Sequence, residues 1–329
     1  MGIQDSIGEI RQDYRRYGLR GFKFNIQDLF QGMLSRGGFW INYGADYYSR
    51  EWDLLVVLDA CRWDLFEEVA DEYDYIKSSG TFMSNASHSR EWLHKHFMEP
   101  KSAKHKIKAW TELLPNVDDM DVFEDHYTMS GRPEVAETTY ITWNVFARML
   151  EGDAFYEYVP VGKAKWDNSE TILNPRTITD ETVRVMRESE PEYVIAHYMQ
   201  PHTPFRDSGG SALDGSVWER IQRGEKQYDE AWTEYKNNLR WVLDDVELLL
   251  ENVDQDNIVI TADHGDAFNE YGVMSHKIGA IHPKIRKVPW VLTSGTDTET
   301  YEPTIERPTD SAVETEEIND QLEALGYKT

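Results

Sequence analysis

Two apolar runs that each end on a carboxylate most constrain how this chain can fold. The run 257–260 leads into Asp263 and His264, and the run 53–58 leads directly into Asp59. Strands buried on both faces of a parallel sheet read as such continuous apolar runs. Because ligands bind at the carboxyl ends of strands in open α/β sheets, we expect these side chains at one sheet edge, with Gly265 allowing a sharp turn beneath an ion. Carboxylate and imidazole donors suit a divalent metal ion.

Helical periodicity alternates with further short apolar segments along the chain. The pattern predicts helices over about 62–72, from Thr179 onward, and over about 225–252, with strands at 192–197 and 288–292. Pro289 favours the start or an edge position for the last of these strands. Strands that alternate with helices predict a mainly parallel sheet covered on both faces, which is a three-layer α/β/α architecture.

The distribution of charge divides the sequence into three parts. Residues 1–50 form an expected N-terminal arm, whose first 36 residues carry six basic and four acidic side chains. Such an arm would pack on the acidic body of the protein or contact an anionic membrane surface. Residues 51–295 form the expected catalytic domain, with an insertion at about 100–175 that shapes a pocket or simply packs. Residues 296–329 form an acidic tail with an expected short helix around 310–325.

Composition excludes several classes of function. The formal net charge of -26 over 329 residues opposes nucleic-acid binding, because the protein would repel phosphates. Cys61 is the only cysteine, so neither an intramolecular disulfide nor a thiolate zinc cluster is possible. The N-terminal residues lack the layout of a secretory signal, and no apolar stretch reaches the length of a membrane span. We therefore expect a cytoplasmic protein.

Several motifs occur in an order that is similar to one known superfamily. They are the segments 56–62 (VVLDACR), 86–89 (ASHS), 197–205 (HYMQPHTPF), 261–266 (TADHGD), 282–283 (HP) before 288–290 (VPW), and 322–327 (LEALGY). In this order they resemble the alkaline phosphatase and sulfatase superfamily, in particular its sulfatase-like hydrolases and transferases. The resemblance covers most of residues 53–327 and implies an alkaline phosphatase-like fold.

The resemblance also implies a metal site. By position in the motifs, Asp59, Asp263 and His264 would hold one divalent ion, with the oxygen of the nucleophile as a further ligand, and His282 is a further candidate metal ligand. The positions of His197, His202 and His282 are those at which relatives place ligands of a second metal or groups that contact the substrate. We therefore expect one or two ions per chain, and mixed oxygen and nitrogen donors accept Zn²⁺, Mn²⁺ or Mg²⁺.

Ser89 is the expected nucleophile, because the segment before it is similar to the Ser-His-Thr approach of sulfatase-like proteins. Coordination to a cation would lower the pKa of its hydroxyl, and the N–H groups of residues 90–92 would face the oxyanion. Ser87 is the alternative nucleophile, and both serines could instead serve only as helix N-caps. Arg90 and His202 complete the expected catalytic set, and Arg90, His197 and His202 the expected substrate contacts.

The reaction is constrained by a departure from the sulfatase pattern. Neither Cys61 nor Ser89 lies in the C/S-x-P/A-x-R context from which formylglycine is made. An unmodified serine suits phosphorus better than sulfur, because a sulfoserine is hard to discharge. We therefore expect a phosphoester hydrolase or phosphotransferase acting on a small-molecule, glycan-linked or lipid-linked ester. The alternatives are a sulfuric ester hydrolase and a non-catalytic binding or assembly protein on the same fold.

The acidic composition leads to a prediction about salt. A pI near 4.7 is typical of proteins from salt-in halophiles, so we expect a haloarchaeal member of the superfamily; the alternative is an acidic protein from a mesophile. Activity and helicity, the latter followed by circular dichroism, should rise from low to molar potassium chloride as salt screens the repulsion between carboxylates. Full stability in the absence of salt would contradict this prediction.

Overall fold

A computed structural model describes residues 14–15, 18–19, 35, 38–39, 44–113, 125–161, 174–206 and 217–304. Within these residues, seven strands form one sheet: β1 (Leu54–Leu58), β2 (Ser79–Met83), β5 (Thr138–Thr142), β6 (Glu157–Pro160), β7 (Tyr193–Tyr198), β8 (Gln255–Thr261) and β11 (Lys287–Gly295). Two smaller sheets pair β3 (Met98–Pro100) with β4 (Tyr127–Met129), and β9 (Ala267–Phe268) with β10 (Met274–Ser275).

The helices fall into two groups. The α-helices are α3 (Trp63–Val69), α4 (Ser89–Phe97), α5 (Ala103–Leu113), α7 (Pro133–Ala136), α8 (Arg176–Glu188), α9 (Val217–Arg223), α10 (Tyr228–Leu250) and α11 (Pro283–Arg286). The 3₁₀ helices are η1 (Tyr47–Ser49), η2 (Ala70–Glu72), η3 (Val145–Met149), η4 (Gly152–Ala154) and η6 (Glu270–Gly272).

The central sheet has the strand order β2-β11-β8-β1-β7-β5-β6. β8, β1, β7, β5 and β6 run parallel, whereas β11 is antiparallel to both of its neighbours. Of the two positions expected for Pro289, the structure shows the strand start and not the edge, because β11 lies between β2 and β8. Pro289 sits near the start of β11, where its carbonyl accepts a hydrogen bond from Thr261 Oγ1 at 2.8 Å.

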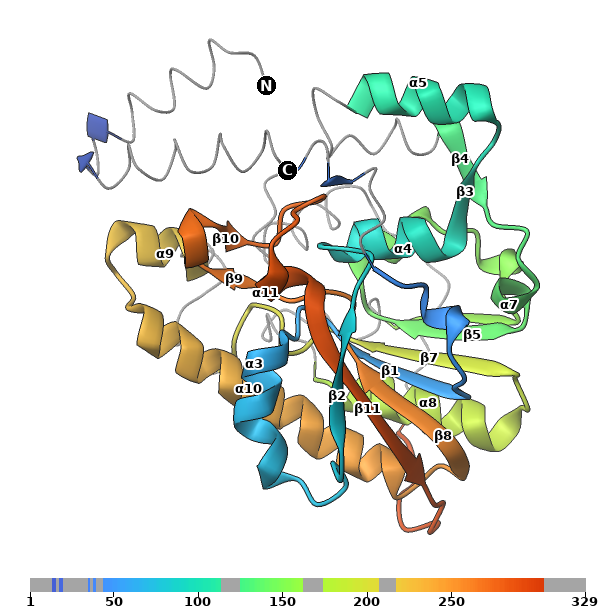
Figure 1. Ribbon diagram of the computed structural model, residues 1–329. Helices are drawn as coiled ribbons and strands as arrows, with labels where there is room; N and C mark the ends of the chain where they lie inside the picture. The colour runs from blue at the N-terminus through green and yellow to red at the C-terminus, as the bar shows by residue number, and fades with distance from the viewer. Residues whose placement is uncertain are drawn as a thin grey trace.

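Helices cover both faces of this sheet (Figure 1). Two consecutive residues of β7, whose side chains point to opposite faces of the sheet, contact helices on both sides. The hydroxyl of Tyr198 bonds Thr179 on α8 at 2.9 Å, whereas the ring of His197 contacts Trp92 on α4. α3 and α10 pack on the α8 side. The predicted three-layer α/β/α architecture with a mainly parallel sheet is confirmed.

Two predicted boundaries change. α8 begins at Arg176, three residues before Thr179, because Asn174 Oδ1 accepts the Arg176 N–H at 3.1 Å and Pro175 precedes the first turn. The segment 100–175 contains β5 and β6, so this part of the chain contributes two strands to the central sheet. Most of the expected arm at 1–50 and the expected helix around 310–325 lie outside the described residues.

Among the described helices, none combines the length and the apolar character needed to cross a bilayer.

Two buried histidines on α4 predict how stability depends on pH. Burial lowers the pKa of His94 to about 3 and that of His96 to about 4, from the usual 6.5. Between pH 6.5 and pH 4 the unfolded chain therefore binds more protons, so the free energy of unfolding falls as the pH falls through this window. At pH 5 each histidine should have lowered the free energy of unfolding by about 2 kcal/mol relative to neutral pH.

Thermal unfolding between pH 7.5 and pH 4.5 checks this prediction. The unfolding temperature should fall on acidification, and it should fall less steeply in His94→Phe, because the ring of His94 packs against Phe39 and Tyr127 and phenylalanine does not titrate. An identical pH dependence in this variant would contradict the assignment.

Candidate metal centre

Asp59 and Asp263 meet at the carboxyl edge of the sheet. β1 and β8 are parallel neighbours in which Val57 lies opposite Thr261, so the residues two positions further along each chain emerge side by side. Both carboxyl groups are buried. The sequence-predicted convergence of the two strand ends is therefore observed.

One oxygen of each carboxyl group is held by the protein. Asp263 Oδ1 accepts the backbone N–H groups of Ala60 at 3.1 Å and of His264 at 2.8 Å. Asp59 Oδ2 accepts hydrogen bonds from Asn144 Nδ2 at 2.9 Å and from Ser89 Oγ at 3.0 Å. Asp59 Oδ1 and Asp263 Oδ2 have no hydrogen-bond partner among the described residues.

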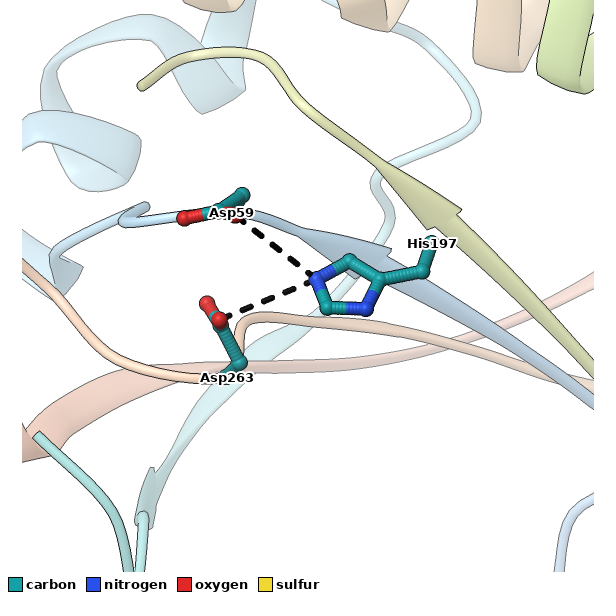
Figure 2. Close-up of side chains that lie close together, drawn as sticks. All are labelled: Asp59, His197 and Asp263. Carbon is teal, nitrogen blue, oxygen red and sulfur yellow. Dashed lines mark ion pairs between the residues drawn. The ribbon is translucent and has the colours of Figure 1, made fainter. Parts of the chain in front are cut away.

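Two imidazoles face the two carboxyl groups. His264 Nδ1 donates to the carbonyl of Gly265 at 2.9 Å, so in the neutral ring Nε2 carries the lone pair. His264 Nε2 lies 3.4 Å from Asp263 Oδ2 and 3.7 Å from Asp59 Oδ1. His197 Nε2 lies 3.7 Å from Asp263 Oδ2 and 3.9 Å from Asp59 Oδ2 (Figure 2). His197 Nε2 has no hydrogen-bond partner among the described residues.

A bound cation would balance the buried carboxylate charge at this edge of the sheet. Burial and the charge of Asp263 raise the pKa of Asp59 well above its usual value. Burial acts to raise the pKa of Asp263 too, but the charges of His264 and His197 in their protonated forms outweigh it, so this pKa is lowered. Two buried carboxyl groups that share one site are expected to separate in this way. The ligand atoms of Asp59, His197 and Asp263 lie within 4.8 Å of one another, and this donor set fits a divalent metal ion.

Ser89 and Ser87 occupy different environments. Ser89 is the first residue of α4, and its Oγ lies 3.0 Å from Asp59 Oδ2 and 3.3 Å from His264 Nε2. Ser87 Oγ instead lies 2.8 Å from Glu91 Oε2 and 2.9 Å from the carbonyl of Lys277. The structure thus brings Ser89, and not Ser87, to Asp59 and His264.

The helix cap limits the expected oxyanion donors. His88 is the N-cap of α4, and its Nδ1 accepts the Arg90 N–H at 3.0 Å. The Trp92 N–H donates to the carbonyl of His88. Two of the three N–H groups that we expected to face a substrate are therefore used within the helix cap. The side chain of Arg90 is 3% exposed, which places its guanidinium inside the protein rather than on an exposed helix start.

A second group of histidines adjoins the first. His202 Nε2 and His276 Nε2 lie 3.3 Å apart, and His276 Nδ1 lies 3.3 Å from Asp266 Oδ1. The ring of His276 stacks on that of His264 with centroids 4.6 Å apart. Burial, followed by the charge of His276, lowers the pKa of His202 to about 3. His202 therefore belongs to a histidine cluster beside the carboxylates.

His282 lies elsewhere. It is the N-cap of α11, where its Nδ1 accepts the Lys284 N–H at 3.2 Å, and its ring contacts that of Tyr271. None of its contacts involves Asp59, Asp263 or His264. The structure places His197, which we expected either to bind a second metal or to contact the substrate, beside Asp59 and Asp263, and it places His282 at the start of α11.

Gly265 is required for a different reason from the one expected. A Cβ at this position would lie 2.5 Å from the carbonyl oxygen of Lys284 and 2.7 Å from Arg62 Cβ. The close packing of α11 and of the segment before α3 therefore excludes a side chain. The left-handed backbone at the site belongs to Ala60, with φ of 60°, whose N–H reaches Asp263.

Asn144 is the site residue that the sequence did not indicate. It follows β5, and its Oδ1 accepts the Phe146 N–H at 3.0 Å, which leaves Nδ2 to donate to Asp59. A polar residue two positions after a strand was the available signal, but the strand itself lay in a region interpreted as an insertion.

No protein-family model matches this sequence, and no curated protein matches it. Solved structures that are similar to it include a 2-O GAG sulfatase, with 13% identity and a TM-score of 0.43. The alignment covers 74% of this chain and 64% of the sulfatase, so the chain spans less than two thirds of that protein.

Two further solved structures are similar over larger shares of their own length. The soluble domain of lipooligosaccharide phosphoethanolamine transferase A from Neisseria meningitidis shows 17% identity and a TM-score of 0.42, covering 73% of this chain and 76% of that chain. A protein in the alkaline phosphatase superfamily from Vibrio parahaemolyticus shows 12% identity and a TM-score of 0.39, covering 90% and 75%. At these values the similarity assigns no activity to this chain.

The carboxylate pair yields a prediction about metal binding. Asp263→Asn keeps an oxygen for the N–H groups of Ala60 and His264 but removes one of the two buried carboxyl groups, which repel each other when both are ionised. We expect it to abolish stabilisation by Zn²⁺, and to leave the metal-free unfolding temperature unchanged or higher. In the wild type, Zn²⁺ at about 100 times its dissociation constant should add about 2.7 kcal/mol.

Thermal unfolding with added Zn²⁺ or with a chelator measures both effects. Asp256→Asn is the matched control, because Asp256 is exposed at the opposite end of the same strand. Equal stabilisation by Zn²⁺ in Asp263→Asn and in the wild type would exclude a metal site at these carboxylates.

Proposed function

We propose that this chain is a divalent-metal-dependent phosphoester hydrolase or phosphotransferase with Ser89 as its nucleophile. One observation carries the proposal. The Ser89 hydroxyl lies within 3.3 Å of Asp59 Oδ2 and His264 Nε2, directly beside carboxylate and imidazole atoms that lack hydrogen-bond partners. A nucleophile next to a prepared cation site is the arrangement that attack by a serine on a phosphate ester needs.

The residues around Ser89 hold it in one position. Asp59 Oδ2 accepts the hydroxyl proton, and Asn144 Nδ2 binds the same oxygen, so the acceptor of that proton is fixed. Ser89 begins α4, where the positive end of the helix dipole favours an anionic group. A cation held by Asp59, Asp263, His264 and His197 would lower the pKa of the hydroxyl and offset charge on the attacked ester.

The arrangement of His202 and His276 favours a second cation site. A carbonyl accepts from His202 Nδ1, and the carboxylate of Asp266 faces His276 Nδ1. In these tautomers the Nε2 lone pairs of both rings face each other at 3.3 Å, which is favourable only with a positive charge between them. We infer that His202 and His276 hold a second divalent ion or bind a protonated group of the substrate.

The choice of phosphate over sulfate rests on the nucleophile. Ser89 is followed by Arg90-Glu91-Trp92, so the sequence context for formylglycine is absent, and an unmodified serine can pass a phosphoryl group to water or to an acceptor alcohol. We propose a phosphate ester carried by a small molecule, a glycan or a lipid, with Arg90 near its oxygens.

Ser89→Ala tests the proposal. It should lower the turnover of p-nitrophenyl phosphate or bis-p-nitrophenyl phosphate by at least about 100-fold, because the nucleophile is lost, while elemental analysis still finds the wild-type metal content. p-Nitrophenyl sulfate, assayed in parallel, reports on the sulfatase alternative.

Ser87→Ala is the matched control, because Ser87 is the same residue type two positions away and contacts Glu91 instead of the carboxylates. If Ser87→Ala alone abolished turnover in a folded protein, the nucleophile assignment would be wrong. Bound metal without turnover of any of the three esters by the wild type would favour the binding-protein alternative.

A further inference from the structure

We propose that Tyr140 is a positioning residue of the metal site, whose hydroxyl accepts the Nδ1–H of His197 and so aims the Nε2 lone pair between Asp59 and Asp263. This inference rests on the proposed metal-dependent function. It assigns a role to a buried tyrosine of β5 that takes no part in the site described above.

The contact itself is short and buried. The hydroxyl of Tyr140 lies 2.9 Å from His197 Nδ1, and both side chains are shielded from solvent. β5 and β7 are parallel neighbours with Tyr140 opposite Ile195 and Thr142 opposite His197, so the tyrosine reaches diagonally across the sheet to the imidazole.

The two imidazoles of the site differ in what holds them. The Nδ1 atom of His264 faces a carbonyl oxygen, which can only accept, so its tautomer is set by the backbone. The Nδ1 atom of His197 faces a hydroxyl, which can donate or accept. The tautomer of His197 therefore depends on whether Tyr140 accepts a proton from it or donates one to it.

Distances inside the site select between these two arrangements. If Tyr140 donated to Nδ1, the proton on Nε2 would point at Asp263 Oδ2 and Asp59 Oδ2, which are 3.7 and 3.9 Å away. These distances are too long for hydrogen bonds, so that proton would be left without an acceptor. If Tyr140 accepts from Nδ1, the lone pair on Nε2 joins the unpartnered carboxylate oxygens as a ligand atom.

Packing keeps the hydroxyl in place. The ring of Tyr140 contacts Phe97 at 5.1 Å and stacks with Phe155 at 5.8 Å and Tyr158 at 6.2 Å between centroids. An aromatic side chain fixed on several sides has little freedom to move its hydroxyl away from His197. Removing that hydroxyl would leave the imidazole free to rotate and its Nδ1–H unpaired.

Tyr140→Phe tests the inference with Zn²⁺ alone as the probe. It preserves the aromatic packing and should weaken Zn²⁺ binding by about 10- to 100-fold, measured by competition with a chelator. Tyr158→Phe is the matched control, because Tyr158 stacks on Tyr140 and its hydroxyl donates to the carbonyl of Ala147 at 3.0 Å. It should change the dissociation constant by less than about twofold.

Two further variants separate failure of this inference from failure of the proposed function. His197→Ala should weaken Zn²⁺ binding at least as much as Tyr140→Phe, and Asp263→Asn should abolish it. If only Asp263→Asn weakens binding, the role of His197 and Tyr140 is overturned and the metal-dependent function stands. If Asp263→Asn binds Zn²⁺ like the wild type, the proposed function itself fails.

The ¹⁵N resonances of the imidazoles in the Zn²⁺-loaded wild type provide a test that needs no variant. We expect a proton on Nδ1 of His197 and the shift of a metal-bound nitrogen on Nε2. A proton on Nε2 would overturn the inference.

Discussion

The repulsion between two buried carboxyl groups, Asp59 and Asp263, is the constraint on which the rest of this site depends. Parallel pairing of β1 and β8 forces these groups together, away from water. The protein offsets only part of this repulsion. Backbone N–H groups and Asn144 bind one oxygen of each group, and the other oxygen has no donor among the described residues. A cation between the free oxygens would remove the remaining repulsion.

A second buried charge, that of Glu91, fixes the proposed nucleophile Ser89 relative to this pair. Glu91 is fully buried in the first turn of α4, where it accepts hydrogen bonds from the N–H groups of Ser87 and Gly279 and from the side chains of Lys95 and Arg286. These contacts tie the start of α4 to the segments around residues 279 and 286. Ser89 is therefore held against Asp59 by a rigid framework, which is the preorganisation that a reacting group requires.

The fold and the site support different kinds of conclusion. A three-layer α/β/α domain with a ligand site at the carboxyl edge of its sheet is compatible with many activities. The case for phosphoryl transfer comes from particular atoms: the Ser89 hydroxyl, the free carboxylate oxygens and two imidazole lone pairs. His202 and His276 extend the same donor chemistry beside the first group and enlarge the region that could bind an anionic ester.

The sequence by itself determined two strands, at 53–58 and 257–260, which the structure has at 54–58 and 255–261. It also determined the position of Asp59 and Asp263 after them, because continuous apolar runs identify buried parallel strands and their ends are local features. Only the tertiary structure distinguished Ser89 from Ser87 and placed His197, rather than His282, beside the two carboxyl groups. It also brought Asn144 and Tyr140 to the site. These choices depend on helix rotation, strand order and the face to which each side chain points. Such quantities are set by packing between segments far apart in the chain, so no local pattern encodes them.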